Sequence, residues 1–505
     1  MSATADPPAL LRIAPGDDVV VTLRAVTAGE CLEVAGLPPL TVGQDVPKGH
    51  KLARHVLPAG STVHKYGAAI GVLTAAVAPG DWVHSHNLRT ALSGQESYTD
   101  TGLRETAPLA QPAAAQRGFL GYRRANGRVA TRNEIWVLAT VGCVARTAQR
   151  IAEAAQRTYA GVIDGVYAYT HPFGCSQLGD DLARTQAIVA GLARHPNVGG
   201  LLLVGLGCES LQLSRLLPDL ELHQGPRIRA FTAQQSDDEV AEGLDKIAEL
   251  VALMRTDVRQ PCPLSDLVLG LKCGGSDGFS GLTANPLVGA VADRVAAAGG
   301  TPVLTEIPEI FGAEHLLMQR AASPAIAGQV AALVNDFKQY FLDHGEPVSE
   351  NPSPGNIAGG ITTLEEKSLG AVQKSGQAPL TQVLRYGESV QQHGLALLEA
   401  PGNDAVSSTA LVAAGATVLL FTTGRGTPLG FPAPTLKIAS NSALAQAKPR
   451  WIDFDAGRLL STATDLDTLA DELLALVLAT ASGQATRAEQ NGERDIAIWK
   501  GGVTL

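Results

Sequence analysis

The sequence predicts a multidomain α/β protein with a small β-rich N-terminal domain, a parallel-sheet domain and a C-terminal α/β domain. Residues 1–92 hold short runs rich in β-branched residues, each bordered by Gly or Pro. From residue 118 onward, apolar runs alternate with Ala- and Leu-rich helical segments, which is the pattern of βαβ units around a parallel sheet. Residues 93–117 lack either periodicity and are rich in Ser, Thr, Pro, Ala and Gln, so we expect a linker.

The elements follow in chain order. In the first domain, strands are expected in DDVVVTLRAV, LTVGQDV, STVHKYGAAIGVLTAAV and DWVHSHNL. The second domain spans residues 118–260. In it, a helical segment follows each of four apolar runs, which are EIWVLATVGC, GVYAYTHPFGC, VGGLLLVGLGC and RIRAFTAQ. The third, residues 261–505, begins with DLVLGLKCGGS and later carries the strand ATVLLFTTGRGT.

Composition excludes several classes of function. The chain has 505 residues, 45% of them hydrophobic, which is enough for several buried cores. Its net charge of −10 comes with no long basic run, so we expect no nucleic-acid partner. No window approaches 18 consecutive apolar residues and the first residues do not resemble a secretory signal, so we expect a cytoplasmic protein without a membrane partner. An anionic ligand must then be held by a local group of Arg and Lys.

Four of the six cysteines stand beside glycine, each just after an apolar run. They are Cys143, Cys175, Cys208 and Cys273. Their wide, irregular spacing does not predict a disulfide framework. Ligands of open parallel sheets bind at the carboxyl ends of the strands, so we expect at least two of these thiols to contribute to a site. Buried packing is the alternative, and we assign it to the other two cysteines.

Two histidines and one glutamate have the chemistry of metal ligands. His84 and His86 alternate in an expected strand, so both imidazoles should point to one face, as a divalent Fe, Mn or Zn ion requires. Two surface histidines beside a turn are the alternative. Glu306 follows the apolar run PVLT, and a carboxylate buried at a strand end needs a metal or a cation.

The segment FTTGRGTPLGFPAPTLKIASN suits an anion. Arg425 stands between two glycines after a strand, where its guanidinium can meet a carboxylate or phosphate through two hydrogen bonds. Thr423 and Lys437 lie in the same segment. No G-x-G-x-x-G fingerprint with a distal acidic residue and no Walker A motif is present, so a nucleotide is not expected.

Taken together, these motifs resemble one family, the altronate and galactarate dehydratases of sugar-acid catabolism. The resemblance covers nearly the whole chain through GHKLA, KYGAAIG, HSHN, GYRRANGRVATRNEIWVLATVGC, HPFGCSQLGDD, GLGCE, CGGSDGFSGLTANP, LTEIPEIFGAEHLL, NPSPGNIAGGITTLEEKSLG, FTTGRGTP, KIASNS, WIDFDAG and WKGGVTL. The HSHN pair, the WIDFDAG form and the residues around QLGDD favour the altronate branch over the galactarate branch. Sulfolactate sulfo-lyases resemble the two parts as separate subunits.

The resemblance implies an N-terminal domain of the SAF type, a Rossmann-like or flavodoxin-like second domain, a family-specific third domain and a homo-oligomer. It also implies dependence on Fe²⁺ or Mn²⁺ and dehydration of D-altronate to 2-dehydro-3-deoxy-D-gluconate. Galactarate dehydration or a sulfolactate-type elimination is the alternative activity. A sugar-acid binding protein without catalysis is the alternative class.

Candidate roles follow from the reaction and from the matched motifs. We expect His84, His86 and Glu306 to bind the metal, and His50, Lys65 and His171 to supply the acid and the base. The expected substrate-binding residues are Arg132, Asn133, Ser276, Asp277, Thr423, Arg425 and Lys437. An iron–sulfur cluster held by Cys143, Cys175, Cys208 and Cys273 is the alternative cofactor.

Overall fold

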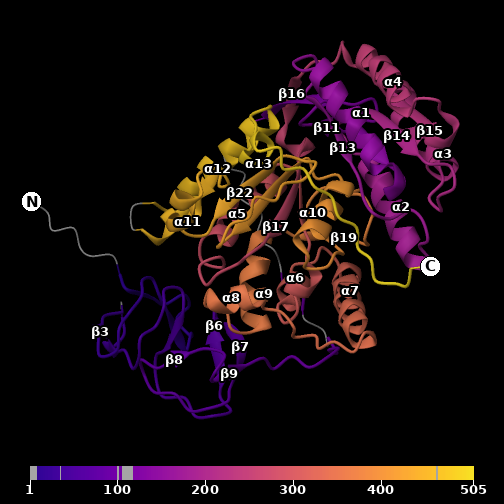
Figure 1. Ribbon diagram of the computed structural model, residues 1–505. Helices are drawn as coiled ribbons and strands as arrows, with labels where there is room; N and C mark the ends of the chain where they lie inside the picture. The colour runs from indigo at the N-terminus through magenta and orange to yellow at the C-terminus, as the bar shows by residue number, and fades with distance from the viewer. Residues whose placement is uncertain (1–7, 35, 99–101, 105–117, 462–463, 505) are drawn as a thin grey trace, which may run out of the picture.

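The computed structural model describes residues 8–34, 36–98, 102–104, 118–461 and 464–504. Figure 1 shows the N-terminal domain in indigo at the lower left, the second domain in magenta at the upper right and the C-terminal domain between them. Residues 99–101 and 105–117 of the predicted linker lie outside the described residues. The described part of it contacts the C-terminal domain, where Gln95 Nε2 donates to the Asn335 carbonyl at 3.3 Å and Arg104 N donates to the Gln319 carbonyl at 2.7 Å.

The N-terminal domain is built from short strands, as predicted. One antiparallel sheet has the order β1-β2-β5-β8, a second has the order β6-β7-β9, and β3 pairs with β4. The strands are β1 (Leu10–Leu11), β2 (Val19–Thr22), β3 (Cys31–Leu32), β4 (Leu40–Thr41), β5 (Lys51–Ala53), β6 (Thr62–Lys65), β7 (Ala68–Leu73), β8 (Trp82–Val83) and β9 (Leu88–Arg89). Glycine is required at Gly80, where φ is +88° and a Cβ would lie 1.9 Å from the Thr41 carbonyl oxygen.

The second domain holds a four-stranded parallel sheet of order β13-β12-β14-β15. The strands are β12 (Glu134–Ala139), β13 (Gly165–Tyr169), β14 (Val198–Gly205) and β15 (Ile228–Thr232). Helices α1 (Ala145–Thr158) and α4 (Glu239–Met254) pack on one face, and α2 (Gly179–Ala193) and α3 (Leu213–Gln224) pack on the other. Numbered along the chain, the order is 2-1-3-4, which is the flavodoxin-like arrangement. Beside this sheet, β10 (Gly118–Arg123) pairs with β11 (Val129–Ala130) and with β16 (Gln260–Pro263).

The C-terminal domain is organised around a seven-stranded parallel sheet of order β19-β20-β18-β17-β21-β22-β23. The strands are β17 (Val268–Cys273), β18 (Thr301–Leu304), β19 (Leu380–Leu384), β20 (Leu395–Leu398), β21 (Val418–Thr423), β22 (Thr435–Ala439) and β23 (Phe454–Asp455). Their near-continuous runs of Val, Leu and Ile suit a sheet that is covered on both faces.

Helices cover both faces of this sheet. Helices α5 (Ala284–Ala297), α7 (Pro324–Asp343) and α12 (Leu466–Ala481) share one core, and α10 (Asp404–Ala413) shares the other core with α2 of the second domain. Helix α10 therefore lies between the two parallel sheets. The shorter helices are α6 (Glu314–Met318), α8 (Pro354–Ala358), α9 (Leu364–Val372), α11 (Ser442–Ala447) and α13 (Arg487–Gln490).

The strand order of the C-terminal sheet defines where a ligand should bind. The chain enters at β17, continues outward through β18, and returns to the other side of β17 at β21. The carboxyl ends of β17 and β21 therefore form the topological switch point, where ligands of open α/β sheets bind. The N-terminal domain contacts helix α9 near this edge, where Glu365 accepts from Ala91 N at 2.7 Å and from Thr90 Oγ1 at 2.8 Å. Among the helices of the described ranges, none is long and apolar enough to cross a membrane.

Candidate active site

A buried ion network begins where β17 ends. Lys272 ion-pairs with Glu306 and contacts Asp404 Oδ1 at 2.8 Å, while Lys374 contacts Glu306 Oε2 at 2.9 Å. Glu306 has a φ of +72°, in the left-handed region that a non-glycine residue adopts at a cost. Burial alone would lower the pKa of both lysines, but the surrounding acidic groups outweigh it and raise both values. Both ammonium groups therefore stay charged.

Cys273 extends this network to helix α9. Its thiol lies 3.1 Å from Glu309 Oε2 and 2.8 Å from Lys374 Nζ, and Glu309 Oε1 lies 2.9 Å from Lys367 Nζ. Burial, Glu306 and Glu309 raise the pKa of Cys273 to about 12, so the thiol is protonated and donates to Glu309. Burial alone would raise the pKa of Glu309, but Lys367 and the other two lysines lower it to about 2.

The N-terminal domain completes the network with two lysines. Lys51 and Lys65, on β5 and β6, each reach Glu366 of helix α9 at 2.8 Å, and all three side chains are buried. Burial lowers the pKa of Lys51 to about 8, although Glu366 opposes the shift. Burial also acts on Lys65, but Glu366 and Tyr66 raise its pKa overall. The two lysines lower the pKa of Glu366 to about 2 against the effect of burial.

Two imidazoles lie beside this ion group. The ring centroids of His50 and His84 are 4.9 Å apart, and His84 Nδ1 lies 3.3 Å from Thr362 Oγ1, which also accepts from Lys51. Burial and Lys51 lower the pKa of both histidines to about 4, so both rings are neutral near pH 7. Neither ring nitrogen of His50 has a partner in hydrogen-bonding geometry among the described residues, although the Ala358 carbonyl lies nearby.

The cavity at this junction is small. It measures about 10 Å³, roughly the room for one water molecule. Its lining comes from the N-terminal domain, the β17 loop and helix α9: Tyr66, Ser276, Asp277, Ser280, Gly281, Asn285, Ile361, Glu366, Lys367, Gly370 and Ala371.

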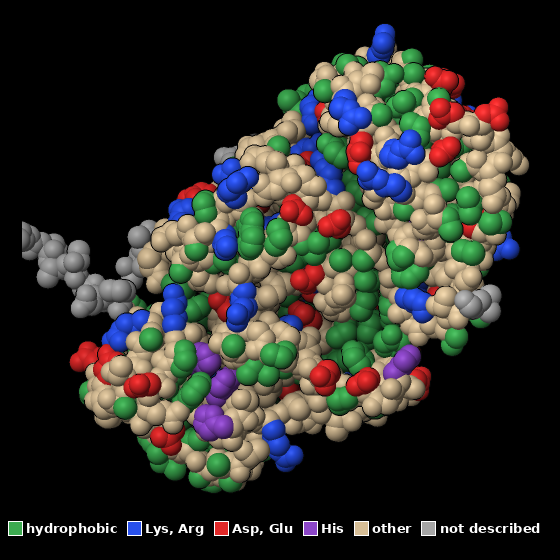
Figure 2. Space-filling view, viewed as in Figure 1, with side chains coloured by type: hydrophobic (Ala, Val, Ile, Leu, Met, Phe, Trp, Pro, Cys, Tyr) green, Lys and Arg blue, Asp and Glu red, His purple; other side chains and the backbone are tan. Residues whose placement is uncertain are grey.

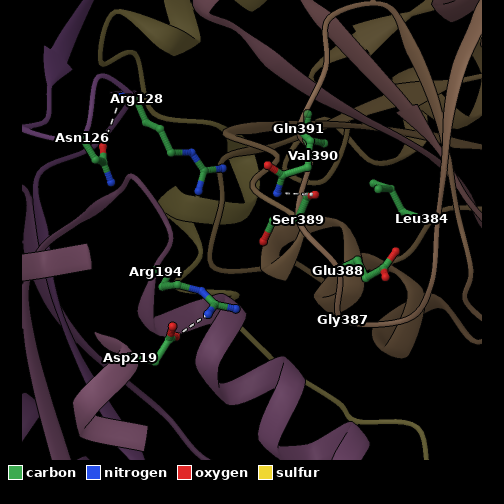
Figure 3. Close-up of a pocket in the computed structure, with 10 residues that line it drawn as sticks. All are labelled: Asn126, Arg128, Arg194, Asp219, Leu384, Gly387, Glu388, Ser389, Val390 and Gln391. Carbon is green, nitrogen blue, oxygen red and sulfur yellow. Dashed lines mark hydrogen bonds and ion pairs between the residues drawn. The ribbon is translucent and has the colours of Figure 1, made fainter. Parts of the chain in front are cut away.

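A larger cavity lies away from this junction, between the second and C-terminal domains (Figure 3). Its volume is about 720 Å³, and Arg128, Arg194 and Asp219 face Ser389 and Glu388 across it. Arg194 forms an ion pair with Asp219 at 2.5 Å. None of the residues that the sequence predicted as catalytic lines this cavity.

Four of the predicted substrate-binding residues lie at the switch point. Asp277 Oδ1 accepts from Ser440 Oγ at 2.8 Å and Asp277 Oδ2 from Asn441 Nδ2 at 3.0 Å, which joins the loops after β17 and β22. The carbonyl of Ser276 accepts from Asn356 Nδ2 at 2.8 Å. Thr423 and Arg425 end β21, where the exposed Arg425 donates to the Gly355 carbonyl at 3.0 Å. Lys437 instead donates to the Pro428 carbonyl at 2.7 Å, and burial lowers its pKa to about 8.

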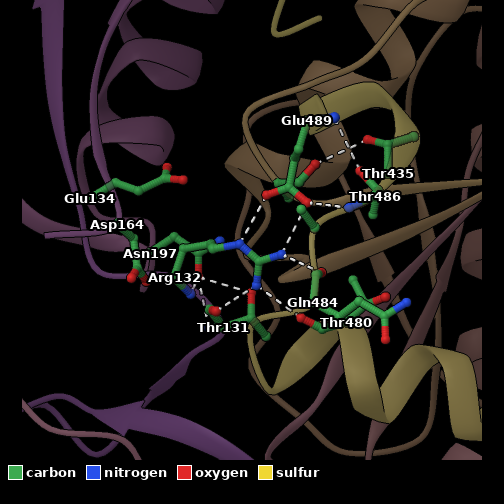
Figure 4. Close-up of polar contacts among 12 residues, drawn as sticks. Thr131, Arg132, Glu134, Asp164, Asn197, Thr435, Thr480, Gln484, Thr486 and Glu489 are labelled. Atoms are coloured by element: carbon green, nitrogen blue, oxygen red, sulfur yellow. Dashed lines mark hydrogen bonds and ion pairs between the residues drawn. The ribbon is translucent and has the colours of Figure 1, made fainter. Parts of the chain in front are cut away.

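Arg132 and Asn133 lie elsewhere, and the prediction that they bind substrate does not agree with their position. Both precede β12, at the amino end of its sheet rather than the carboxyl end. Arg132 is 5% exposed, and its guanidinium is bonded to both oxygens of Glu489 at 2.9 and 3.0 Å and to the Thr480 and Gln484 carbonyls (Figure 4). Asn133 Oδ1 accepts from Arg124 at 2.8 Å. Arg132 therefore joins the second domain to the C-terminal domain, whereas the Asn133 contact lies within the second domain.

The structure also departs from the predicted metal ligand set. Strand β8 ends at Val83, and a turn follows in which Asn87 N donates to the His84 carbonyl at 3.0 Å. His84 is therefore buried while His86 is exposed, so the two rings do not share a strand face. Figure 2 shows histidine side chains gathered on the surface of the N-terminal domain. Glu306 does not join these histidines, because its carboxylate is held by Lys272 and Lys374 of its own C-terminal domain.

The only group of three possible metal ligands found among the described residues is Cys273, Glu306 and Glu309, whose donor atoms lie within 4.8 Å of one another. This group does not fit a divalent cation in its present state, because Lys272, Lys367 and Lys374 already neutralise it and the thiol is protonated. His50 and His84 fit better, since both rings are neutral and His50 has free ring nitrogens.

The four grouped cysteines occupy two different sheets. Cys143, Cys175 and Cys208 are exposed at the carboxyl edge of the second-domain sheet, whereas Cys273 is buried in the C-terminal domain. His171, predicted as an acid or base, lies in the Cys175 loop, where Phe173 N donates to its Nδ1 at 3.2 Å and burial lowers its pKa to about 4. His171 thus belongs to the cysteine loops and not to the lysine network.

Sequence reasoning missed several members of the network. Lys272 and Lys374 were not predicted, and Lys51 was overlooked in favour of Lys65. A signal for Lys272 existed, because a lysine within the apolar run LVLGLKC must be buried and therefore paired. Lys374 follows a helix and carries no comparable signal.

Three family profiles match the chain. Residues 8–91 match the altronate/galactarate dehydratase SAF domain, residues 121–255 match the second domain of D-galactarate dehydratase/altronate hydrolase, and residues 264–504 match the C-terminal domain of D-galactarate/altronate dehydratase. An altronate dehydratase of Bacillus subtilis (strain 168) is 44% identical over 98% of this chain and 99% of its own length. The chain belongs to the altronate/galactarate dehydratase family.

Two further members of the altronate/galactarate dehydratase family help to place the chain within it. An altronate dehydratase of Escherichia coli (strain K12) is 47% identical over 97% of this chain and 98% of its own length. A galactarate dehydratase (L-threo-forming) of the same organism is 33% identical over 87% of each chain. The N-terminal domain is accordingly a SAF domain, as the resemblance implied.

Proposed function

We propose that this protein is a hydro-lyase that converts D-altronate to 2-dehydro-3-deoxy-D-gluconate and water. One buried cluster at the switch point carries the proposal. In it, Lys51 and Lys65 pair with Glu366, and Glu366 and Lys367 line a small cavity together with the β17 loop. Support for the substrate comes from the relatives named altronate dehydratase, at 44 and 47% identity, against 33% for the galactarate enzyme.

The reaction makes two demands on the site. The proton on C2, beside the carboxylate, is only weakly acidic, so its removal needs a base and stabilisation of the enediolate that forms. The hydroxyl on C3 is a poor leaving group, so its departure needs a proton donor. The resulting enol then becomes the 2-keto acid.

Lys51 has the properties of the base. Burial lowers its pKa to about 8, so a useful fraction of the amine is neutral near pH 7 and can accept the C2 proton. Lys65, at the other oxygen of Glu366, stays charged. It is therefore suited to stabilise negative charge on the enediolate rather than to accept a proton.

Lys367 is suited to protonate the departing hydroxyl. It lines the small cavity together with Glu366 and Ser276, and its ammonium is held by Glu309 at 2.9 Å, Asn351 at 2.9 Å and Asn356 at 3.0 Å. The proton moves from Lys367 Nζ to the C3 oxygen as the C3–O bond breaks, and water leaves. Arg425, exposed at the end of β21, can bind the substrate carboxylate in a bidentate manner.

A divalent Fe²⁺ or Mn²⁺ ion, which the family resemblance implies, would be held by His50 and His84. When bound, such an ion supplies a Lewis acid for the carboxylate and the α-hydroxyl of the substrate. His86 is exposed, so we do not count it among the metal ligands.

Substrate entry requires a local opening. A cavity of about 10 Å³ cannot hold a six-carbon acid, so the SAF domain or the segment that leads into α9 must move away from the β17 loop. A homo-oligomer and a cytoplasmic location stay predictions of the resemblance and of the sequence.

The substrate is tested with a panel of altronate, galactarate, mannonate and sulfolactate under reducing conditions with Fe²⁺ or Mn²⁺. A semicarbazide assay detects the α-keto acid. We expect turnover of altronate at the highest kcat/KM of the panel. A faster reaction with galactarate or sulfolactate would move the activity to that branch, and binding without product would identify a binding protein.

The site is tested with Lys51→Met, Lys367→Met and the matched control Lys246→Met, on α4, where Lys246 forms an ion pair with Glu242 at 3.2 Å and lies near Glu249. We expect kcat to fall by about 10²-fold or more in the first two variants and to be unchanged in the control. Wild-type kcat in Lys51→Met would remove Lys51 from the mechanism.

A further inference from the structure

Three exposed cysteines lie at one edge of the second domain, outside the lysine network. Cys143 follows β12, Cys175 follows β13 and Cys208 follows β14, and these three strands are neighbours in the sheet. Exposed thiols are rare on protein surfaces unless they react or bind a metal. Three at the carboxyl ends of adjacent strands therefore call for a ligand.

The loops that carry these cysteines are bonded to one another. Gly142 N donates to the Phe173 carbonyl at 2.9 Å, and Ser210 N donates to the Gly174 carbonyl at 2.9 Å. Thr140 Oγ1 donates to Glu209 Oε1 at 2.7 Å. These bonds lie within three residues of a cysteine on both sides, so the three loops form one unit.

Glycine makes this close packing possible. At Gly174, φ is +96° and a Cβ would lie 2.0 Å from the Thr140 carbonyl oxygen, so no other residue fits. The same loop holds a buried polar atom without a partner among the described residues, Gln177 Nε2, whereas His171 Nε2 lies outside strict hydrogen-bonding geometry but has the Ala139 carbonyl nearby. A buried donor without a partner needs an explanation, and a bound group is one such explanation.

The place of the cysteines in the fold favours a bound ligand. The strand order 2-1-3-4 puts the topological switch point between β12 and β14. Cys143 and Cys208 flank this point, and Cys175 stands beside Cys143 on the next strand. The thiols thus occupy the position at which flavodoxin-like sheets bind their ligands.

The arrangement of the described thiols does not suit a single tetrahedral ion. Ligands of one tetrahedral ion lie close together, yet the three cysteines do not form a group within 4.8 Å in the described residues. In an iron–sulfur cluster each thiolate binds a different iron, so its ligands are farther apart. We propose that Cys143, Cys175 and Cys208 hold a [4Fe–4S] cluster whose fourth iron has no protein ligand.

This assignment does not depend on the proposed dehydration, because it uses none of the lysine network. It also leaves Cys273 out of the set of cluster ligands. The fourth iron, exposed to solvent, would be open to an oxygen ligand such as a carboxylate or a hydroxyl.

The full-length protein, purified without oxygen and reconstituted with Fe²⁺ and sulfide, tests the proposal. We expect about four acid-labile sulfides per chain and about four irons in addition to any ion held by His50 and His84, with a visible absorption band and an electron paramagnetic resonance signal on reduction. Cys143→Ser, Cys175→Ser and Cys208→Ser should each lower bound sulfide by about tenfold or more.

The matched control is Cys31→Ser, because Cys31 is also exposed but lies on β3 of the SAF domain. Sulfide should stay at the wild-type level in this variant and in Glu366→Gln, which alters only the lysine network. Thermal unfolding shows that each serine variant is folded. Iron without labile sulfide, zinc alone, a disulfide between the thiols, or equal cluster content in all cysteine variants would overturn the proposal.

Discussion

Glu366 and Lys65 are 301 positions apart in the sequence, yet Lys65 Nζ lies 2.8 Å from Glu366 Oε1 and both side chains are buried. This contact joins the SAF domain to helix α9 of the C-terminal domain. Because Lys51 occupies the other carboxylate oxygen, one acidic residue neutralises two buried ammonium groups. We therefore expect both the stability and the activity of the protein to depend on this arrangement.

Removal of the Glu366 charge should destabilise the protein. In Glu366→Gln, two buried lysines lose the one carboxylate that pairs with them among the described residues, so we expect a loss of about 3–5 kcal/mol in unfolding free energy, measured with urea. The control is Glu472→Gln, which breaks a surface pair with Arg458 and should cost less than about 1 kcal/mol. Equal losses in the two variants would show that the buried pair adds no special stability.

The activity should follow the titration of Lys51. Because the base acts in its neutral form and its pKa is about 8, kcat/KM should rise with pH and level off above about 8. The measurement is the pH profile of the α-keto acid assay. Lys65→Met is the comparison: it removes a like charge that lowers the pKa of Lys51, so the profile should move to higher pH. A kcat/KM that does not rise with pH below about 8 would contradict the role of Lys51 as the base.

Acid should weaken the fold through Glu309 and Glu366. Both carboxyls have a pKa lowered from 4.5 to about 2, so the folded state binds fewer protons than the unfolded state in this range. Their stabilisation is present above about pH 4.5 and is lost as the pH falls toward about 2. Melting temperatures recorded across this window should show a smaller slope for Glu366→Gln than for the wild type, and an unchanged slope would contradict the assignment.

Arg132 should matter for stability and not for substrate binding. Arg132→Ala leaves Glu489 buried with only Arg494 nearby, so we expect a loss of about 3–5 kcal/mol by urea unfolding. At a temperature where the variant is folded, KM for altronate should stay at the wild-type value. A large rise in KM would instead support the original prediction that Arg132 contacts the substrate.

Metal content should separate the two histidines of the HSHN segment. His84→Ala and His50→Ala remove the neutral, buried imidazoles, so bound Fe²⁺ or Mn²⁺, measured per chain after dialysis, should fall by about tenfold or more. His86→Ala changes an exposed side chain and should keep the wild-type content. An equal loss of bound metal in all three variants would support the site with His84 and His86 that the strand pattern predicted.

The fold could be predicted from the sequence to the level of its layers. Apolar runs followed by glycine-rich loops predicted the strands of both parallel sheets, because strands covered on both faces must be apolar throughout. The strand pattern failed locally at DWVHSHN, where Asn87 closes a turn with its side chain and backbone, and so separates His84 from His86. Such a turn depends on local hydrogen bonds that alternation alone does not reveal.

The candidate site was only partly predictable for a different reason. Glu306, Asp277 and Arg425 could be placed at strand ends from the local sequence. The partners of Glu306 could not, since Lys374 reaches it from 68 positions away and Lys51 reaches Glu366 from 315. The position of Arg132 away from the switch point was not predicted, because a loop before a strand lies at the opposite edge of a parallel sheet from the loop after it.

The position of Lys51 and Lys65 on a separate domain affects how the protein could be divided. A cut in the segment that joins the SAF domain to the remainder would leave the pairing of these lysines with Glu366 intact, because non-covalent contacts rather than chain connectivity hold the halves in register. Two co-expressed fragments should therefore reassemble into an active enzyme, whereas either fragment alone would lack half of the charged groups that the reaction requires.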